Sequence, residues 1–156
     1  MYNSLLINEN LDKESHSEDS LKGIAESTNL IEAINYSTLY KSLGKYKFEE
    51  YIKKIISHNN VNLIFFGIGA EMIIDILFIK ELSENFNVKI IMSFPDSEHL
   101  FEDIDRYYAQ TADLVWVNNP DIEKIFNVYG TPTFCGLGFD TNRYKVKKIN
   151  KSIDVS

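Results

Sequence analysis

The chain has 156 residues, 44% of them hydrophobic and 25% charged, with a net charge of -7. These values are typical of one globular domain, and they exclude disordered, collagen-like and disulfide-rich proteins. The single cysteine cannot form an internal disulfide and no secretory leader is recognisable, so we expect a cytoplasmic protein.

Charge along the chain argues against two kinds of partner. The longest apolar stretch, residues 61–82, contains four charged side chains, so we predict no membrane span. Residues 61–140 carry 13 acidic and 4 basic side chains, whereas residues 141–156 carry 1 and 5. An acidic body repels phosphate backbones, so we expect no nucleic-acid partner and interpret the basic end as a solvated connector.

The first thirty residues of the chain are poorly patterned. Residues 2–7 are compatible with a short strand, and the polar segment 8–20 lacks periodicity and is interpreted as a loop. From Tyr46, apolar side chains recur at helical spacing, which predicts an amphipathic surface helix. We therefore divide the chain into a poorly patterned segment (1–30), a Rossmann-like domain (31–140) and a basic connector (141–156).

Beyond residue 60, apolar runs alternate with helical segments. Continuous apolarity is typical of strands buried on both faces, and the spacing leaves room for crossover helices. The predicted fold is α/β, a Rossmann-like doubly wound parallel sheet. The predicted strands are 61–66, 88–94, 113–117 and 132–137, and the predicted helices are 70–85, 97–110 and 120–129, the last ended by a left-handed Gly130.

The predicted helix 70–85 is apolar around nearly its whole circumference. One sheet face cannot bury all of these side chains. Either the helices before residue 60 pack over this helix, which we favour, or a partner domain or subunit covers it.

Ligands of such sheets bind outside the carboxyl ends of the strands. This rule selects four loops, at residues 67–69, 95–99, 118–121 and 136–140. The candidate binding residues in them are Gly67, Gly69, Asn118, Asn119, Gly138 and Asp140.

The Gly67-x-Gly69 turn leads from a predicted strand into a helix. Met72 stands where a dinucleotide fingerprint has its third glycine, so we expect no dinucleotide site. The two glycines either let a ligand approach the backbone or simply form a tight turn.

Asp96 and His99 are the candidate catalytic residues. His99 and Asp103 are four residues apart, so on one helix face the carboxylate would orient the imidazole as a general base. The alternative is a solvated acidic helix face. No second histidine or cysteine completes a ligand set with Asp96, His99 and Glu102, so we expect no metal site.

The region from residue 94 onward resembles a known family. Its motifs are Phe-Pro-Asp-Ser-Glu-His-Leu-Phe at 94–101, Ile-Asp-Arg-Tyr-Tyr-Ala-Gln-Thr-Ala-Asp-Leu-Val at 104–115, Gly130, and Gly-Leu-Gly-Phe-Asp at 136–140. In this order they resemble the CgeB-like, spore-maturation-type glycosyltransferases. The resemblance extends over about residues 40–156.

The resemblance implies one half of a GT-B architecture, in which two Rossmann-like domains face each other across a cleft. This half would form the acceptor side, and a second domain beginning near residues 154–156 would hold the nucleotide-sugar donor. Asp96 or His99 would be the base of an inverting transfer, whereas a retaining enzyme needs no such base. No cofactor is implied, the acceptor is a saccharide or a protein, and the isolated chain should be inactive.

A competing hypothesis is a non-catalytic module. Such a module would keep the half-fold and recognise a saccharide or a partner protein without transferring sugar.

Overall fold

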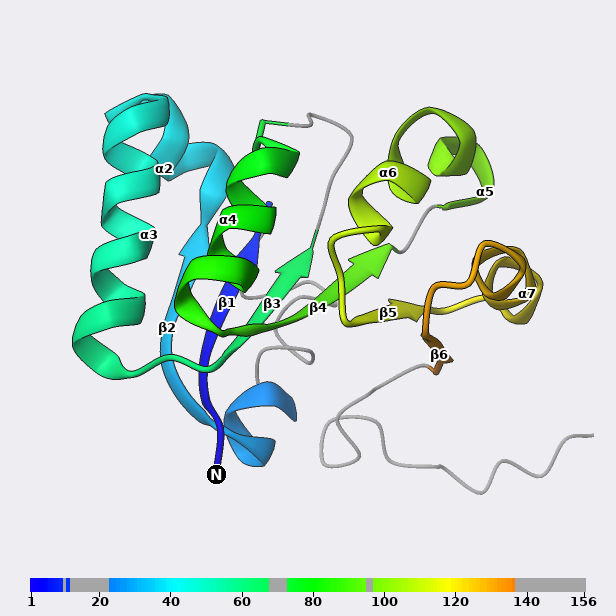
Figure 1. Ribbon diagram of the computed structural model, residues 1–156, viewed down its shortest axis with the longest axis horizontal. Coiled ribbons are helices and arrows are strands. Elements are labelled where there is room, and N and C mark those ends of the chain that lie inside the picture. Colours follow the sequence, from blue (N-terminus) through cyan, green and yellow to red (C-terminus); the bar gives the residue numbers. More distant parts are fainter. Residues whose placement is uncertain (10, 12–22, 68–72, 95–96, 137–156) are drawn as a thin grey trace, which may run out of the picture.

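A six-stranded, all-parallel sheet forms the centre of the molecule. The computed structural model describes residues 1–9, 11, 23–67, 73–94 and 97–136. The strand order is β2-β1-β3-β4-β5-β6 (Figure 1). The predicted α/β, Rossmann-like doubly wound sheet is therefore confirmed. The strands are β1 (Asn3–Asn8), β2 (Asn29–Asn35), β3 (Leu63–Gly67), β4 (Lys89–Phe94), β5 (Leu114–Val117) and β6 (Thr133–Cys135).

Helical segments connect the strands, and polar side chains directly before several of these helices cap them. Asn35, Asp75 and Asn119 cap the helices that follow by accepting a backbone N–H. Gly130, with φ of 75°, ends the last helix as predicted. Within the described ranges, no helix has the length and apolarity needed to cross a membrane. The segments are α2 (Tyr36–Leu43), α3 (Lys45–Asn59), α4 (Ile76–Phe86), α5 (Ser97–Leu100), the π-helical turn η1 (Phe101–Asp105), α6 (Arg106–Ala109) and α7 (Pro120–Val128).

The main core lies between the sheet and one layer of helices. Alternate strand residues point to this face, and the helices that pack on it bury apolar side chains in the same cluster. The strand members are Leu5, Ile7, Ile64, Phe66, Ile90, Met92, Phe94, Val115 and Val117, and the helix members include Phe48, Ile52, Ile79, Leu82, Ile104, Ile122 and Phe126. In Figure 1, α4 lies in front of the sheet, and α3 lies at the side next to β2.

Helix α3 packs beside α4, as expected from the excess of apolar residues in the second helix. The rings of Phe48 and Phe78 meet edge-on with centroids 6.4 Å apart. Lys53 pairs with Glu81 at 2.6 Å and lies 5.6 Å from the centre of the Phe78 ring. The prediction that helices before residue 60 cover this helix is confirmed.

The opposite face of the sheet is buried near β1 and more open towards β6. Ser4 and Leu6 are buried there, and the Ser4 hydroxyl hydrogen-bonds Thr28 at 2.7 Å. Further across, Trp116 is partly exposed and Phe134 is 55% exposed. The indole N–H of Trp116 donates to the carbonyl oxygen of Gly136 at 2.7 Å.

Strand β2 corrects the interpretation of the first third of the chain, which assigned no strand to residues 29–35. Its residues are mostly half-buried, and β1 is its one neighbour in the sheet. An edge strand of this kind gives neither a continuous apolar run nor a clean alternation. The expected boundary at residue 30 falls inside β2. The connector 141–156 and most of the expected loop 8–20 lie outside the described residues.

Two predicted helices have different limits or geometry. Helix α4 begins at Ile76 rather than residue 70, because residues 73–75 are not helical and Asp75 is the cap. The start at Ile76 determines which face of α4 is buried. Leu77 lies outside that face and is 72% exposed. The predicted helix 97–110 consists of α5, η1 and α6, so a π-helical turn interrupts its α-helical periodicity.

Candidate functional site

The carboxyl ends of all six strands lie at one edge of the sheet, because every strand pair is parallel. Three candidate residues occur there in the described chain: Gly67 at the end of β3, and Asn118 and Asn119 just after β5. His99 lies in α5, which follows β4. Gly69, Asp96, Gly138 and Asp140 lie outside the described residues.

Gly67 makes a close contact with Asn8, the last residue of β1. The two residues are partners in the register of β1 and β3. A Cβ atom added to Gly67 would lie 2.8 Å from Cγ of Asn8, closer than real Cβ atoms approach. The missing side chain of Gly67 therefore provides the space that the Asn8 carboxamide occupies.

Asn8 was not a candidate in the sequence analysis, which placed it at the start of a polar loop. A short apolar strand that ends in a carboxamide was the one available signal. That signal indicates a candidate site residue only when the strand is known to lie inside the sheet, as β1 does.

Asn119 connects two of the predicted loops. Its Oδ1 accepts the backbone N–H of Asp121 at 2.9 Å and starts α7, while its Nδ2 donates to the carboxylate of Glu98 in α5. Both ends of the carboxamide are therefore used inside the protein. Asn118 beside it is exposed. The hydrogen bond between Asn119 and Glu98 joins the start of α5 to the start of α7.

His99 is exposed and follows Glu98 directly. The expected pairing with Asp103 is not formed, since neither side chain makes a polar contact with any other described residue. The physical reason is η1, whose wider turn begins at Phe101 and changes the angle between positions four residues apart. His99 thus lies at the carboxyl edge without a described carboxylate to orient it.

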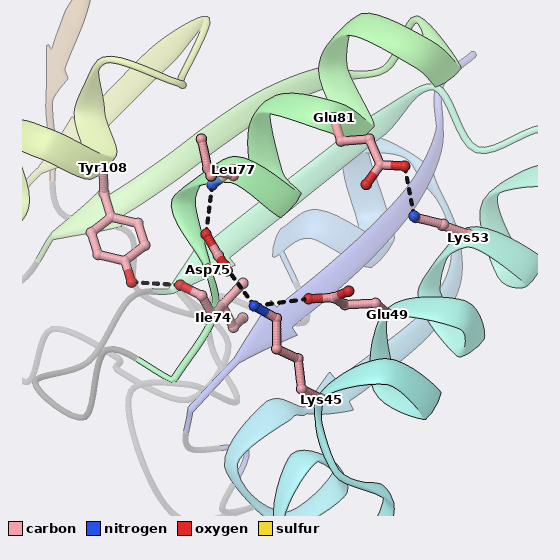
Figure 2. A network of polar contacts seen from close by, with 8 residues as sticks. All are labelled: Lys45, Glu49, Lys53, Ile74, Asp75, Leu77, Glu81 and Tyr108. Atoms are coloured by element: carbon pink, nitrogen blue, oxygen red, sulfur yellow. Dashed lines mark hydrogen bonds and ion pairs between the residues drawn. The ribbon is translucent and has the colours of Figure 1, made fainter.

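A polar network holds the start of α4 at the same edge (Figure 2). Lys45, the first residue of α3, donates to Asp75 at 2.6 Å and lies 4.0 Å from Glu49. Asp75 also accepts the N–H of Leu77 at 2.9 Å. The hydrogen bond from Lys45, and after it the N–H of Leu77, lower the pKa of Asp75 below its ordinary value. Asp75 therefore stays ionised as both cap and ion-pair partner.

Tyr108 of α6 fixes the residue before this cap. Its hydroxyl donates to the carbonyl oxygen of Ile74 at 2.6 Å, and both residues are buried (Figure 2). Burial first, and then the negative charge of Asp75, raise the pKa of Tyr108, so its phenol remains a donor above the usual range. Side chains of α3 and α6 thus hold residues 74 and 75 at the start of α4.

Within the described chain, no group of three or more His, Cys, Asp or Glu side chains could hold a metal ion. Among the described strand-end side chains, Asn8 at the end of β1 and Ser93 near the end of β4 are neutral hydrogen-bonding groups, and the carboxylate of Glu9 follows Asn8 directly.

Comparisons of the chain with protein-family models, with curated proteins and with solved structures give no match. The resemblance to CgeB-like glycosyltransferases therefore depends on the sequence motifs alone and stays a prediction.

Proposed function

We propose that this chain is the acceptor-side half of a cytoplasmic glycosyltransferase. In this proposal a second Rossmann-like domain holds a nucleotide-sugar donor, and the carboxyl edge of this sheet binds a saccharide or protein acceptor. The support comes from the parallel sheet, the resemblance in sequence and the neutral polar groups at that edge.

The observation that carries the proposal is the position of His99 beside a bridged pair of loops. The hydrogen bond from Asn119 to Glu98 ties the loop after β4 to the loop after β5. His99 is the next residue and its side chain is exposed at this edge. An imidazole in this position is accessible to an acceptor bound at the edge.

In an inverting transfer, an acceptor hydroxyl oxygen attacks the anomeric carbon of the donor sugar. The bond from that carbon to the phosphate oxygen breaks, and the nucleoside diphosphate leaves with the electron pair. The hydroxyl proton passes to a base, for which His99 and Asp96 are the two candidates. Imidazole side chains commonly serve as general bases in enzymes.

The test is transfer by the protein that joins this chain to its donor-binding domain. Release of nucleoside diphosphate from UDP-glucose and UDP-N-acetylglucosamine is measured with pooled acceptors. His99→Ala or Asp96→Asn should lower kcat by about 10² to 10⁴-fold with an unchanged Tm. His58→Ala is the matched control, because His58 is an exposed histidine in the last turn of α3.

Full turnover by both the His99 and the Asp96 variants would contradict the assignment of either residue as the general base. Absence of sugar-dependent release from the unmodified protein would contradict the transferase proposal itself.

A non-catalytic saccharide-binding module is the second candidate. It is favoured by the absence of any described side chain that orients His99. Saccharide binding without nucleoside diphosphate release would identify this alternative.

A further inference from the structure

The strand order of the sheet reverses at β1. From β1 the chain passes to β2 on one side, whereas every later connection leads in the other direction, towards β6. With right-handed connections, the first crossover then lies on the opposite face from the others. Crossovers that separate in this way open a crevice between the ends of β1 and β3, where ligands bind in sheets of this order.

Asn8 lies at that crevice with an available side chain. Its carboxamide contacts Gly67 across the β1–β3 pair and is partly exposed. No described residue forms a hydrogen bond with this carboxamide. A carboxamide offers two N–H donors and one carbonyl acceptor. The described part of the chain leaves these groups available to a ligand at the end of the sheet.

Ser93 of β4 continues the row of register partners that Asn8 and Gly67 begin on β1 and β3. It is the register partner of Gly67, and it stands between Met92 and Phe94, which both face the main core. Because strand side chains alternate, Ser93 points to the same face as Asn8. Its hydroxyl is half-buried and has no hydrogen-bond partner in the described chain.

The side chains of Asn8 and Ser93 favour a neutral ligand. A carboxamide and a hydroxyl each donate and accept, as the hydroxyl groups of a sugar do. Recognition of phosphate usually uses arginine, lysine or backbone N–H groups. The described residues at these strand ends carry no positive charge, and the ammonium group of Lys45 is paired with Asp75.

We propose that Asn8 and Ser93 bind hydroxyl groups of a saccharide in the crevice between β1 and β3, with Gly67 providing the space for the Asn8 carboxamide. The inference rests on the proposed acceptor-side function and names the residues that hold the acceptor.

The experiment is a two-dimensional NMR titration of the full chain with methyl β-glucopyranoside, methyl β-galactopyranoside and N-acetylglucosamine. Inorganic phosphate serves as the anionic probe. At least one sugar should shift the side-chain NH₂ signals of Asn8 and the backbone signals of Gly67 and Ser93, and phosphate should not. Asn8→Ala should weaken sugar binding about tenfold or more, as expected for a lost hydrogen-bonding pair.

Two further variants keep the result interpretable. Gly67→Ala should displace the Asn8 carboxamide and weaken binding similarly while the spectrum stays folded. Asn127→Ala is the matched control, since Asn127 is an exposed asparagine of α7, and should bind like the unmodified chain.

Sugar-induced shifts confined to Asn118, Asn119 and His99, with Asn8→Ala binding normally, would overturn this inference and leave the proposed function intact. No shift with any of the three sugars would overturn the saccharide site proposed here, whereas the proposed function would remain with a protein acceptor. A response to phosphate alone would overturn the assignment of a neutral ligand.

Discussion

Two residues of α4 that are two positions apart should differ sharply in their contribution to stability. Ile79 is fully buried in the core, whereas Leu77 is 72% exposed. Ile79→Ala removes three carbon groups worth about 0.8 kcal/mol each, and it also leaves a cavity, so we expect a loss of about 2 to 5 kcal/mol. Leu77→Ala removes the same number of carbons from a mostly solvated site, so its cost should stay below about 1 kcal/mol.

The measurement is urea unfolding followed by circular dichroism, with the midpoint and the slope fitted separately. If Ile79→Ala does not fold, Ile79→Val should still lower stability by about 0.5 to 1.5 kcal/mol. Equal losses for the two alanine variants, or a greater loss at Leu77, would refute the burial pattern and with it the start of α4 at Ile76.

Three other predictions follow from the polar network and the proposed half-site. Tyr108→Phe leaves the buried Ile74 carbonyl without its donor, so urea unfolding should show a loss of about 1 to 3 kcal/mol, and an unchanged midpoint would contradict the contact. The pKa of Asp75 is lowered on folding, so its contribution is complete above about pH 4 and is lost as the pH falls through the lower folded value. Acid titrations of stability should therefore be less steep for Asp75→Asn than for the unmodified chain, and identical curves would contradict the ion pair. Finally, this chain alone should neither transfer sugar from UDP-glucose nor gain thermal stability from UDP, and a clear rise in Tm with UDP would place the donor site in this half.

The strands that form the middle of the sheet could be predicted from the sequence because both of their faces contact protein. The run Leu-Ile-Phe-Phe in β3 and the run Ile-Ile-Met in β4 are apolar without interruption, as expected for central parallel strands. β2 has a neighbour on one side only, and its residues are mostly half-buried. Its pattern was therefore too weak to distinguish from a loop.

The candidate site was only partly predictable, since its geometry depends on features without a local signal. The rule that ligands bind outside the carboxyl ends of parallel strands selected Gly67, Asn118 and Asn119, and these residues do lie at one edge of the sheet. The positions of the His99 and Asp103 side chains relative to each other depend on η1, and no pattern in residues 101–105 predicts a π-helical turn. Asn8 required the strand order, which is a property of the whole chain.

The π-helical turn η1 also changes the rotation of α5 about the helix axis relative to α6. A π turn accommodates one more residue than an α turn over nearly the same rise, so α5 and α6 are out of phase with each other. Tyr108, anchored to Ile74, fixes the rotation of α6, while the rotation of α5 decides where His99 points. Deleting one residue from 101–105 would restore an α-helical repeat and rotate His99 relative to α6. The orientation of His99 in α5 is thus set by the π-helical turn that begins two residues after it.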